Sequence, residues 1–221
     1  MTCRLVDYWS GVSGHELIHP ADQTVLTGMK HKLKTALSPN PFFGPLASAP
    51  IVLLFLNPGW RQFDDERADL PETPLFFQRQ RSGCAPLPSS DEYESTHSWI
   101  SKILRQFGLD IDAVRERLAV VNLCPYRSES FKDHHMLAAL PSCRATRDWA
   151  QNTLFPQAEA DERVVVCLRA AKHWGLKDGF EKGSLFAPTV TRGGFMYRGD
   201  FRDRVVGAVR MKLCLPPIAS T

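Results

Sequence analysis

The chain has 221 residues, of which 43% are apolar and 23% charged, and its net charge is +3. This length suits one α/β domain with a sizeable core, and the composition excludes a chain that is disordered as a whole. No apolar run approaches the ~20 residues of a membrane span. The first residues also lack the basic-then-apolar order of a secretory signal. We therefore expect a cytoplasmic protein with no membrane partner.

The six cysteines are widely scattered and form no C-x-x-C pair. This spacing argues against a zinc knuckle or an iron–sulfur cluster, whose ligands are clustered in sequence. We expect no metal and no cofactor. The cysteines are Cys3, Cys84, Cys124, Cys143, Cys167 and Cys214.

Residues 1–40 are predicted to form an N-terminal extension of helix and loop, and residues 41–215 an α/β domain. Leu26, Met29, Leu33 and Leu37 recur at helical spacing, which predicts a helix over 23–37. A loop rich in proline and glycine then leads into an apolar run over 51–56. A continuous run of this kind is typical of a central parallel strand that is buried on both faces.

The segment 61–96 holds many Pro, Ser and charged residues, with an apolar island at Leu75-Phe76-Phe77. We interpret it as a long functional loop or lid. A helix over 99–107 is expected next, ended by Gly108. Asp110 is placed to cap a shorter helix over 111–117.

The remainder of the chain alternates between strands and helices. Strands are predicted over 118–123, 164–168 and 185–191, and helices over 142–154, 170–174 and 200–213. Ser142 is the expected cap of the first of these helices. The alternation predicts a three-layer α/β sandwich whose central, mostly parallel sheet has four strands.

The pentad Leu56-Asn57-Pro58-Gly59-Trp60 follows the most hydrophobic run in the chain. Proline fixes φ and lacks an N–H, while glycine allows backbone angles closed to other residues, so the strand ends abruptly here. Ligands bind at the carboxyl ends of the strands in open α/β sheets. Asn57 is therefore a candidate site residue, and Asn122 ends the next predicted strand in the same way.

The pentad, the strand that ends in Asn122 and the preface Asn40-Pro41-Phe42-Phe43-Gly44 resemble the uracil-DNA glycosylase superfamily, in particular its mismatch-specific branch. The resemblance covers roughly residues 40–213. It implies a glycosylase-like α/β fold that flips a nucleotide out of DNA and reads its base in a pocket.

The resemblance also implies roles for individual residues. Asn57 would position the attacking water, although an amide cannot act as a general base at neutral pH. Pro58 and Gly59 would contact the flipped base, and Asn122 would face its edge. Phe76 or Phe77 would stack on the base.

The fourth strand departs from the family pattern. Active members usually carry a His-Pro-Ser or Asn-Pro-Ser turn there, whereas this chain has Thr191-Arg192-Gly193-Gly194. Arg192 is always charged and could stabilise the departing base anion as a catalytic residue. The DNA backbone would be contacted by Arg79, Gly193, Gly194 and Arg198.

The expected function is hydrolysis of the N-glycosidic bond of uracil or a related lesion in DNA, by a monomer. The main alternative is a glycosylase-like fold that binds nucleic acid or a nucleobase without cleaving it. A third is a pocket for a small nucleotide or nucleobase that is unrelated to DNA. A nucleophile made of Cys124 with His134 or His135 is a weaker alternative, because a buried structural thiol explains this cysteine better. A metal site at Asp133-His134-His135 is also a weaker alternative, because the strands do not end in further aspartates.

Overall fold

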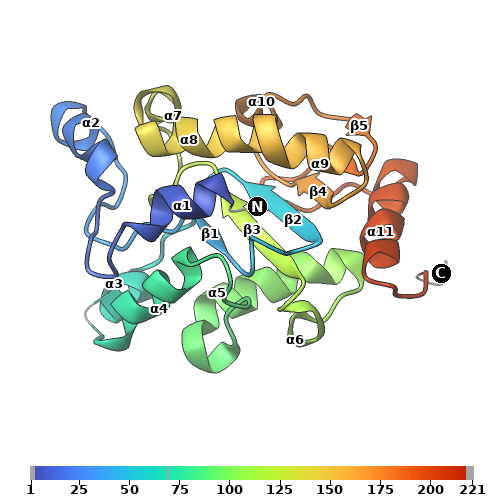
Figure 1. Ribbon diagram of the computed structural model, residues 1–221, viewed down its shortest axis with the longest axis horizontal. Helices are drawn as coiled ribbons and strands as arrows, with labels where there is room; N and C mark the ends of the chain where they lie inside the picture. The colour runs from blue at the N-terminus through green and yellow to red at the C-terminus, as the bar shows by residue number, and fades with distance from the viewer. Residues whose placement is uncertain (1–2, 69, 218–221) are drawn as a thin grey trace.

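A six-stranded mixed sheet runs through the centre of the computed structural model, which describes residues 3–68 and 70–217 (Figure 1). The strand order is β1-β3-β2-β4-β6-β5. The middle four strands are parallel, while β1 and β5 pair antiparallel at the two edges. The strands are β1 (Phe42–Phe43), β2 (Ile51–Phe55), β3 (Leu118–Asn122), β4 (Val164–Cys167), β5 (Phe180–Lys182) and β6 (Leu185–Ala187).

The α/β class agrees with the sequence prediction, but the prediction of a four-stranded sheet is corrected to six strands. The strands that were missed are β1 and β5, which have two and three residues. Strands this short carry too little alternation to be read from sequence. The last predicted strand is also shorter, because β6 ends at Ala187, directly before Pro188, and a proline cannot donate to a ladder.

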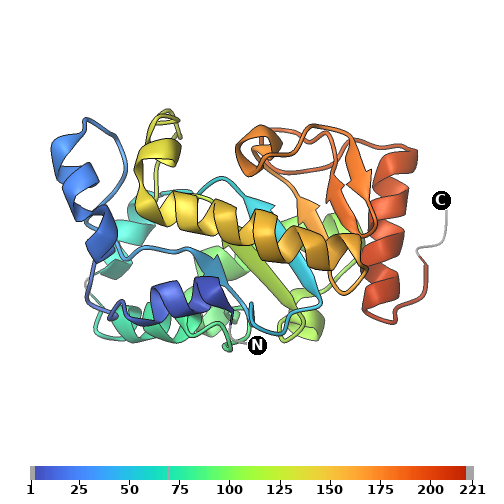
Figure 2. The ribbon, with the colours of Figure 1, turned by 45° about the horizontal axis from the view of Figure 1, so that its top comes forward.

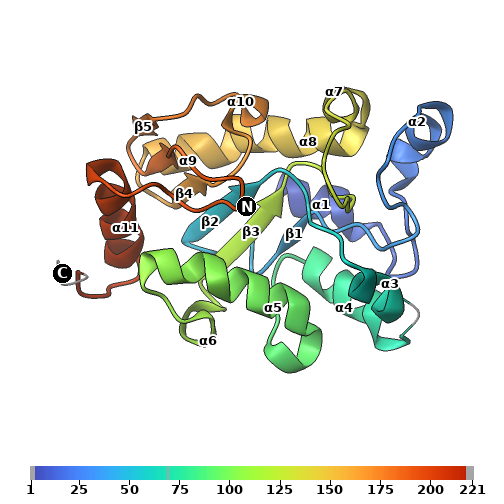
Figure 3. The ribbon, with the colours of Figure 1, turned by 180° about the vertical axis from the view of Figure 1, so that it is seen from behind.

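Helices cover both faces of the sheet (Figures 1, 2 and 3). A separate apolar core fills each face. β2 supplies both cores because its side chains alternate. Val52 and Leu54 join one core, and Ile51, Leu53 and Phe55 join the other. The first face is covered by α1 (Arg4–Ser10), α8 (Pro141–Trp149), α9 (Phe155–Glu159) and α10 (Ala171–Trp174), and the second by α4 (Glu72–Arg81), α5 (Ser90–Leu104), α6 (Ile111–Val114) and α11 (Asp200–Lys212).

Two predictions on the amino-terminal half are wrong. The helix predicted over 23–37 stops early, as α2 (Gln23–Gly28), and Leu33 and Leu37 are buried from the chain that follows it. The predicted loop over 61–96 instead contains α3 (Gln62–Ala68), α4 and the start of α5. Glu92 and Ser89 form a capping box that begins α5 well before the predicted start.

Other helix ends agree with the sequence or differ from it in detail. Gly108 ends the turn after α5 in a left-handed conformation, with φ 62°, and Asp110 accepts a hydrogen bond from the N–H of Asp112 at the start of α6. The remaining segments are the 3-10 turns η1 (Pro20–Asp22) and η2 (Arg105–Phe107), α7 (Met136–Ala139) and a π-helical stretch, η3 (Ala150–Leu154).

Ser142 does not cap α8, because that helix begins one residue earlier, at Pro141. The carboxylate of Asp22 accepts the hydrogen bond from the N–H of Ser142 at 2.9 Å, and the hydroxyl of Tyr126 donates to the same carboxylate at 2.7 Å. Asp22 is completely buried. The extension that precedes the sheet is therefore joined to α8 and to the chain after β3. None of the helices in the described ranges is long and apolar enough to span a bilayer.

Candidate functional site: a cavity at the ends of two parallel strands

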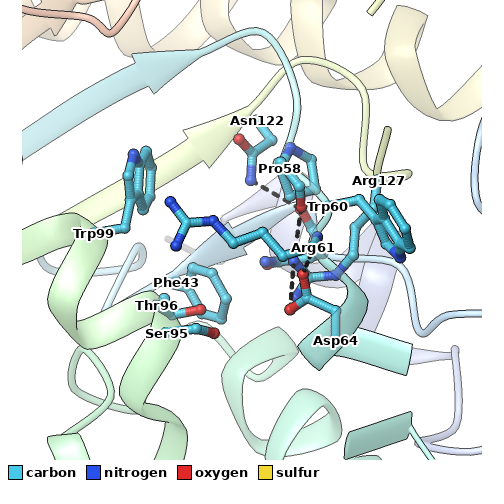
Figure 4. A pocket seen from close by; sticks show the side chains of 12 residues that line it. Phe43, Pro58, Trp60, Arg61, Asp64, Ser95, Thr96, Trp99, Asn122 and Arg127 are labelled. Carbon is cyan, nitrogen blue, oxygen red and sulfur yellow. Dashed lines mark hydrogen bonds and ion pairs between the residues drawn. The ribbon is translucent and has the colours of Figure 1, made fainter. Parts of the chain in front are cut away.

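A cavity of about 160 Å³ lies beyond the carboxyl ends of β2 and β3 (Figure 4). Its lining combines three aromatic rings, two carboxamides, two arginines and one carboxylate. The lining residues are Asn40, Phe43, Pro58, Gly59, Trp60, Arg61, Asp64, Ser95, Thr96, Trp99, Asn122 and Arg127. Of the residues predicted from sequence, Pro58, Gly59 and Asn122 line this cavity.

Asn122 is held in place by the sheet on one side and by the chain before β1 on the other. It is the last residue of β3 and pairs in register with Phe55. Its N–H donates to the carbonyl of Pro41 at 2.8 Å, and its side-chain Nδ2 donates to the carbonyl of Asn40 at 3.0 Å. Its Oδ1 is buried and has no hydrogen-bond partner. Buried polar atoms normally have a partner, so this oxygen is a candidate group for binding a ligand.

Asn40 is the second carboxamide of the cavity, and the sequence prediction gave it no role. The residue is 1% exposed, and both polar atoms of its side chain lack a partner. Its backbone is fixed by two neighbours. Its N–H donates to the carbonyl of Pro125 at 2.8 Å, and Arg81 donates to the preceding carbonyl, that of Pro39, at 3.2 Å.

Arg81 is almost fully buried, and burial lowers the pKa of its guanidinium to about 10. It is therefore still a cation at neutral pH. Its second hydrogen bond, to the carbonyl of Ser13, ties the amino-terminal extension to the same support. Arg81 does not line the cavity, and it stabilises the backbone that precedes Asn40.

Three aromatic side chains form the walls: Phe43, Trp60 and Trp99 (Figure 4). Trp99 meets the ring of Phe55 edge-on, with the ring centroids 4.9 Å apart. The Nζ of Lys34 lies 3.9 Å from the ring centroid of Trp60. Flat rings around a small cavity suit a planar ligand, because aromatic faces stack at low entropic cost.

Phe76 and Phe77, the predicted stacking residues, lie in α4 and are 6% and 3% exposed. Neither lines the cavity. Their rings pack behind Phe43, with centroid separations of 6.1 and 6.4 Å. They therefore support Phe43, whose ring is one of the three that line the cavity.

A buried ion pair closes one side of the cavity. Nη1 of Arg127 lies 3.4 Å from Oδ1 of Asp64 and donates to the carbonyl of Gly59 at 3.0 Å, and both side chains are 7% exposed. The second oxygen of Asp64 accepts the N–H of Arg61 at 2.8 Å. Nη2 of Arg127 is buried without a partner, so it can still donate to a ligand.

Asn57 does not line the cavity. Its Nδ2 donates to the carbonyl of Pro58 at 2.8 Å and to the hydroxyl of Ser128 at 2.9 Å. The carboxamide therefore fastens the turn that carries Pro58 and Gly59. A methyl group added at Gly59 would meet no described atom within 4 Å, so the space over this backbone is open.

Arg192 lies in a second cavity, of about 480 Å³, where the chain leaves β4 and β6. Arg169, Lys172 and Lys177 line it as well, with one carboxylate, Asp178. The guanidinium of Arg169 donates to the carbonyl of Arg192. Burial, and then the neighbouring charge of Arg192, lower the pKa of Arg169. Cations held this close together favour an anionic ligand.

The other predicted backbone contacts are divided between two surfaces. Gly193 and Arg198 are exposed near Arg192, whereas Gly194 is buried and its carbonyl accepts a hydrogen bond from Gln106 at 3.2 Å. Arg79 lies in α4, where it forms an ion pair with Glu92. A Cβ at Gly194 would lie 3.1 Å from the ring of Phe55, so the loop at 191–196 packs beside the first cavity.

The weaker alternatives find little support from the geometry. Cys124 is completely buried in a core. His134 stacks on the ring of His173, with centroids 5.0 Å apart. Within residues 3–68 and 70–217, no three His, Cys, Asp or Glu side chains gather closely enough to hold a metal ion.

The chain matches no protein-family model, no curated protein and no solved structure. The resemblance to uracil-DNA glycosylases therefore rests on the sequence motifs, and the assignment of function rests on the two cavities.

Proposed function

We propose that the cavity beyond β2 and β3 binds a nucleobase extruded from DNA, and that the protein is a DNA glycosylase. The reaction is hydrolysis of the N-glycosidic bond of uracil or a related lesion. The observation that carries this proposal is the combination of flat aromatic walls with the buried, unpartnered Oδ1 of Asn122. Stacking holds any base, and a fixed carboxamide distinguishes one base edge from another.

The charges of the cavity suit the chemistry of the bond that breaks. When the bond between base and sugar is cleaved heterolytically, its electron pair remains on the base, and water adds to the sugar. Arg127 has a free donor at Nη2, and Arg61 lines the same cavity. A cation beside the departing base stabilises its negative charge. Asp64 carries a negative charge that can favour the positive charge on the sugar.

The basic cavity is the proposed contact for the phosphates that flank the extruded nucleotide. Arg169, Arg192, Lys172 and Lys177 provide positive charge at the same edge of the sheet. Phosphate contacts of this type position DNA without reading its sequence. In this arrangement Arg192 binds the backbone, and the catalytic role predicted for it passes to Arg127.

A second candidate function, binding of a base without cleavage, is favoured by the hydrogen bonds of the two groups that could activate water. The Nδ2 of Asn57, the residue predicted to position water, is engaged by Pro58 and Ser128, and the residue does not line the cavity. Asp64 is the one carboxylate among the described lining residues, and it is engaged by Arg127 and by the N–H of Arg61. Neither group is free to activate water strongly.

The test is strand cleavage after alkali treatment of oligonucleotides that contain uracil, hypoxanthine or a T:G mismatch. Wild type is compared with Asn57→Ala, Asn122→Ala and Arg127→Ala, and with Asn152→Ala as a control on an exposed asparagine in η3. A glycosylase cleaves at least one substrate, and Asn122→Ala and Arg127→Ala reduce the rate by about 100-fold or more. Base-specific DNA binding without cleavage would assign the second function. An absence of both would reject the base-binding site.

A further inference from the structure

The orientation of the Asn122 carboxamide is fixed by the backbone of Asn40. A carbonyl oxygen can only accept a hydrogen bond, so the atom of Asn122 that lies 3.0 Å from the carbonyl of Asn40 must be Nδ2. The amide cannot flip without losing this bond. Oδ1 is then held in the other direction, and it is a buried acceptor without a partner on a residue that lines the cavity.

The side chain of Asn40 has no structural task that the described residues reveal. It is 1% exposed, it lines the cavity, and neither Nδ2 nor Oδ1 has a hydrogen-bond partner. Burying a polar group without a partner costs free energy, and a leucine of similar size would avoid that cost. The same residue also fixes Asn122 through its backbone, so two carboxamides are placed side by side at one end of the cavity.

We propose that Asn40 determines base specificity, and that with Asn122 it selects a base edge carrying an N–H beside a carbonyl. This inference rests on the proposed base-binding function. Oδ1 of Asn122 accepts the ring N–H, and Nδ2 of Asn40 donates to the neighbouring carbonyl. Uracil, thymine, hypoxanthine and guanine carry such an edge.

Cytosine and adenine are rejected by the same geometry. Each presents a ring nitrogen without hydrogen where the selected bases carry an N–H, so its lone pair would face Oδ1 of Asn122. The repulsion cannot be relieved by a flip, because Nδ2 is engaged by Asn40. A site built around fixed hydrogen bonds discriminates strongly, since the wrong ligand leaves buried polar groups unpaired.

The experiment measures the binding of fluorescein-labelled single strands that carry one 2′-fluoroarabino nucleotide, which resists cleavage at the N-glycosidic bond. The base is uracil, N3-methyluracil or cytosine. Single strands keep base pairing out of the comparison. The proteins are wild type, Asn40→Asp, Asn40→Leu and the control Asn152→Asp. Asn40→Asp keeps the shape and removes the donor, while Asn40→Leu removes both polar atoms, and both variants retain the backbone carbonyl that holds Asn122.

Wild type and Asn152→Asp are expected to bind the uracil strand at least about 10-fold more tightly than the N3-methyluracil and cytosine strands. Asn40→Leu is expected to lose that preference through weaker binding of uracil, while binding to the cytosine strand stays within about twofold. Asn40→Asp is expected to lose it through weaker binding of uracil and tighter binding of cytosine, because its carboxylate accepts a hydrogen bond from the exocyclic amine of cytosine. Thermal unfolding establishes that each variant is folded, and the wild-type comparison with N3-methyluracil requires no substitution.

The other outcomes separate the two proposals. If folded Asn40 variants keep the full preference for uracil, Asn40 is not the specificity residue, and the base-binding site stands. If wild type prefers uracil over cytosine but binds uracil and N3-methyluracil equally well, the ring N–H is not recognised, and the inference is overturned. If wild type shows no preference among the three strands, both the proposed function and this inference fail.

Discussion

The two cavities at the carboxyl edge of the sheet differ in how their polar groups are held. Beyond β2 and β3 the side chains of Asn40, Asn122 and Arg127 are buried, and backbone carbonyls hold those of Asn122 and Arg127. Beyond β4 and β6 the cations are half-buried or exposed, and they surround a larger space. The first arrangement suits recognition of one planar group, and the second suits attraction of a charged chain. One sheet thus carries a cavity with buried polar groups and a cavity with more exposed charges.

Removal of an aromatic wall should give the largest effect and should act only on the first cavity. Trp99→Ala removes a ring from the lining and the edge contact with Phe55. We expect affinity for the uracil strand to fall about 10- to 100-fold, because base stacking contributes ~1–3 kcal/mol. Fluorescence anisotropy measures the loss. Trp99→Phe, which keeps a ring, should recover most of it, and an equal loss in both variants would contradict the stacking role.

Gln106, just beyond the helix that carries Trp99, holds the loop at 191–196, so its removal tests how firmly that loop is anchored. Its side chain donates to the carbonyl of Gly194 and accepts the N–H of Met196 at 2.9 Å. Gln106→Leu leaves both backbone groups unpaired, and we expect the free energy of unfolding to fall by ~2 kcal/mol. Urea unfolding measures it, with the exposed Gln78→Leu as a control.

Hydrogen exchange at Met196 adds a local readout for the same variant. If the loop at 191–196 loosens, its exchange should accelerate more than that of β2. Uniform acceleration across the chain would show that Gln106 supports the whole fold and not this loop.

Removal of one cation from the basic cavity should weaken DNA binding only a few-fold, and equally for every base. Arg169→Ala and Arg192→Ala each remove one charge from this cavity. The slope of log Kd against log salt should shrink by about 0.7 for each lost phosphate contact on a single strand. Arg144→Ala, on the exposed side of α8, should leave the slope unchanged. A loss confined to the uracil strand would place these arginines at the base instead.

The smallest expected effect is a change of the free energy of unfolding with pH, which arises from His173 beside the basic cavity. Burial is the main reason that the pKa of His173 is lowered, and the neighbouring His134, Lys172 and Arg147 lower it further. The unfolded chain therefore binds the proton more readily than the folded one. The free energy of unfolding should fall as the pH drops through about 6.5 and level off below the folded pKa. Urea midpoints at pH 7 and pH 5 should differ less in His173→Gln than in wild type.

The sequence predicted the parts of the fold that depend on neighbouring residues. The apolar runs of β2, β3 and β4 are continuous enough to be recognised. Pro58 and Gly59, which follow β2, line the cavity with Asn122, the last residue of β3. The helices α3 and α4 were missed, because the prolines and charges between residues 61 and 81 conceal their apolar side chains.

The rest of the site depends on contacts between distant segments. Asn40 reaches Asn122 only because β1 pairs with β3 across about eighty positions, which no local periodicity reports. Arg127 follows β3 in a stretch without a recognisable pattern, and its role comes from Asp64 and Gly59. Trp99 was predicted only as the first residue of a helix, whereas its ring both contacts Phe55 and lines the cavity.

The antiparallel strands β1 and β5 also determine how the sheet meets other molecules. They cover the outer edges of β3 and β6, and they offer only two and three residues to any further strand. A long, flat edge invites another chain to add itself by backbone hydrogen bonds, and very short edge strands discourage it. The parallel strands that carry the two cavities are therefore shielded from strand addition, and this protein has a built-in safeguard against edge-to-edge aggregation.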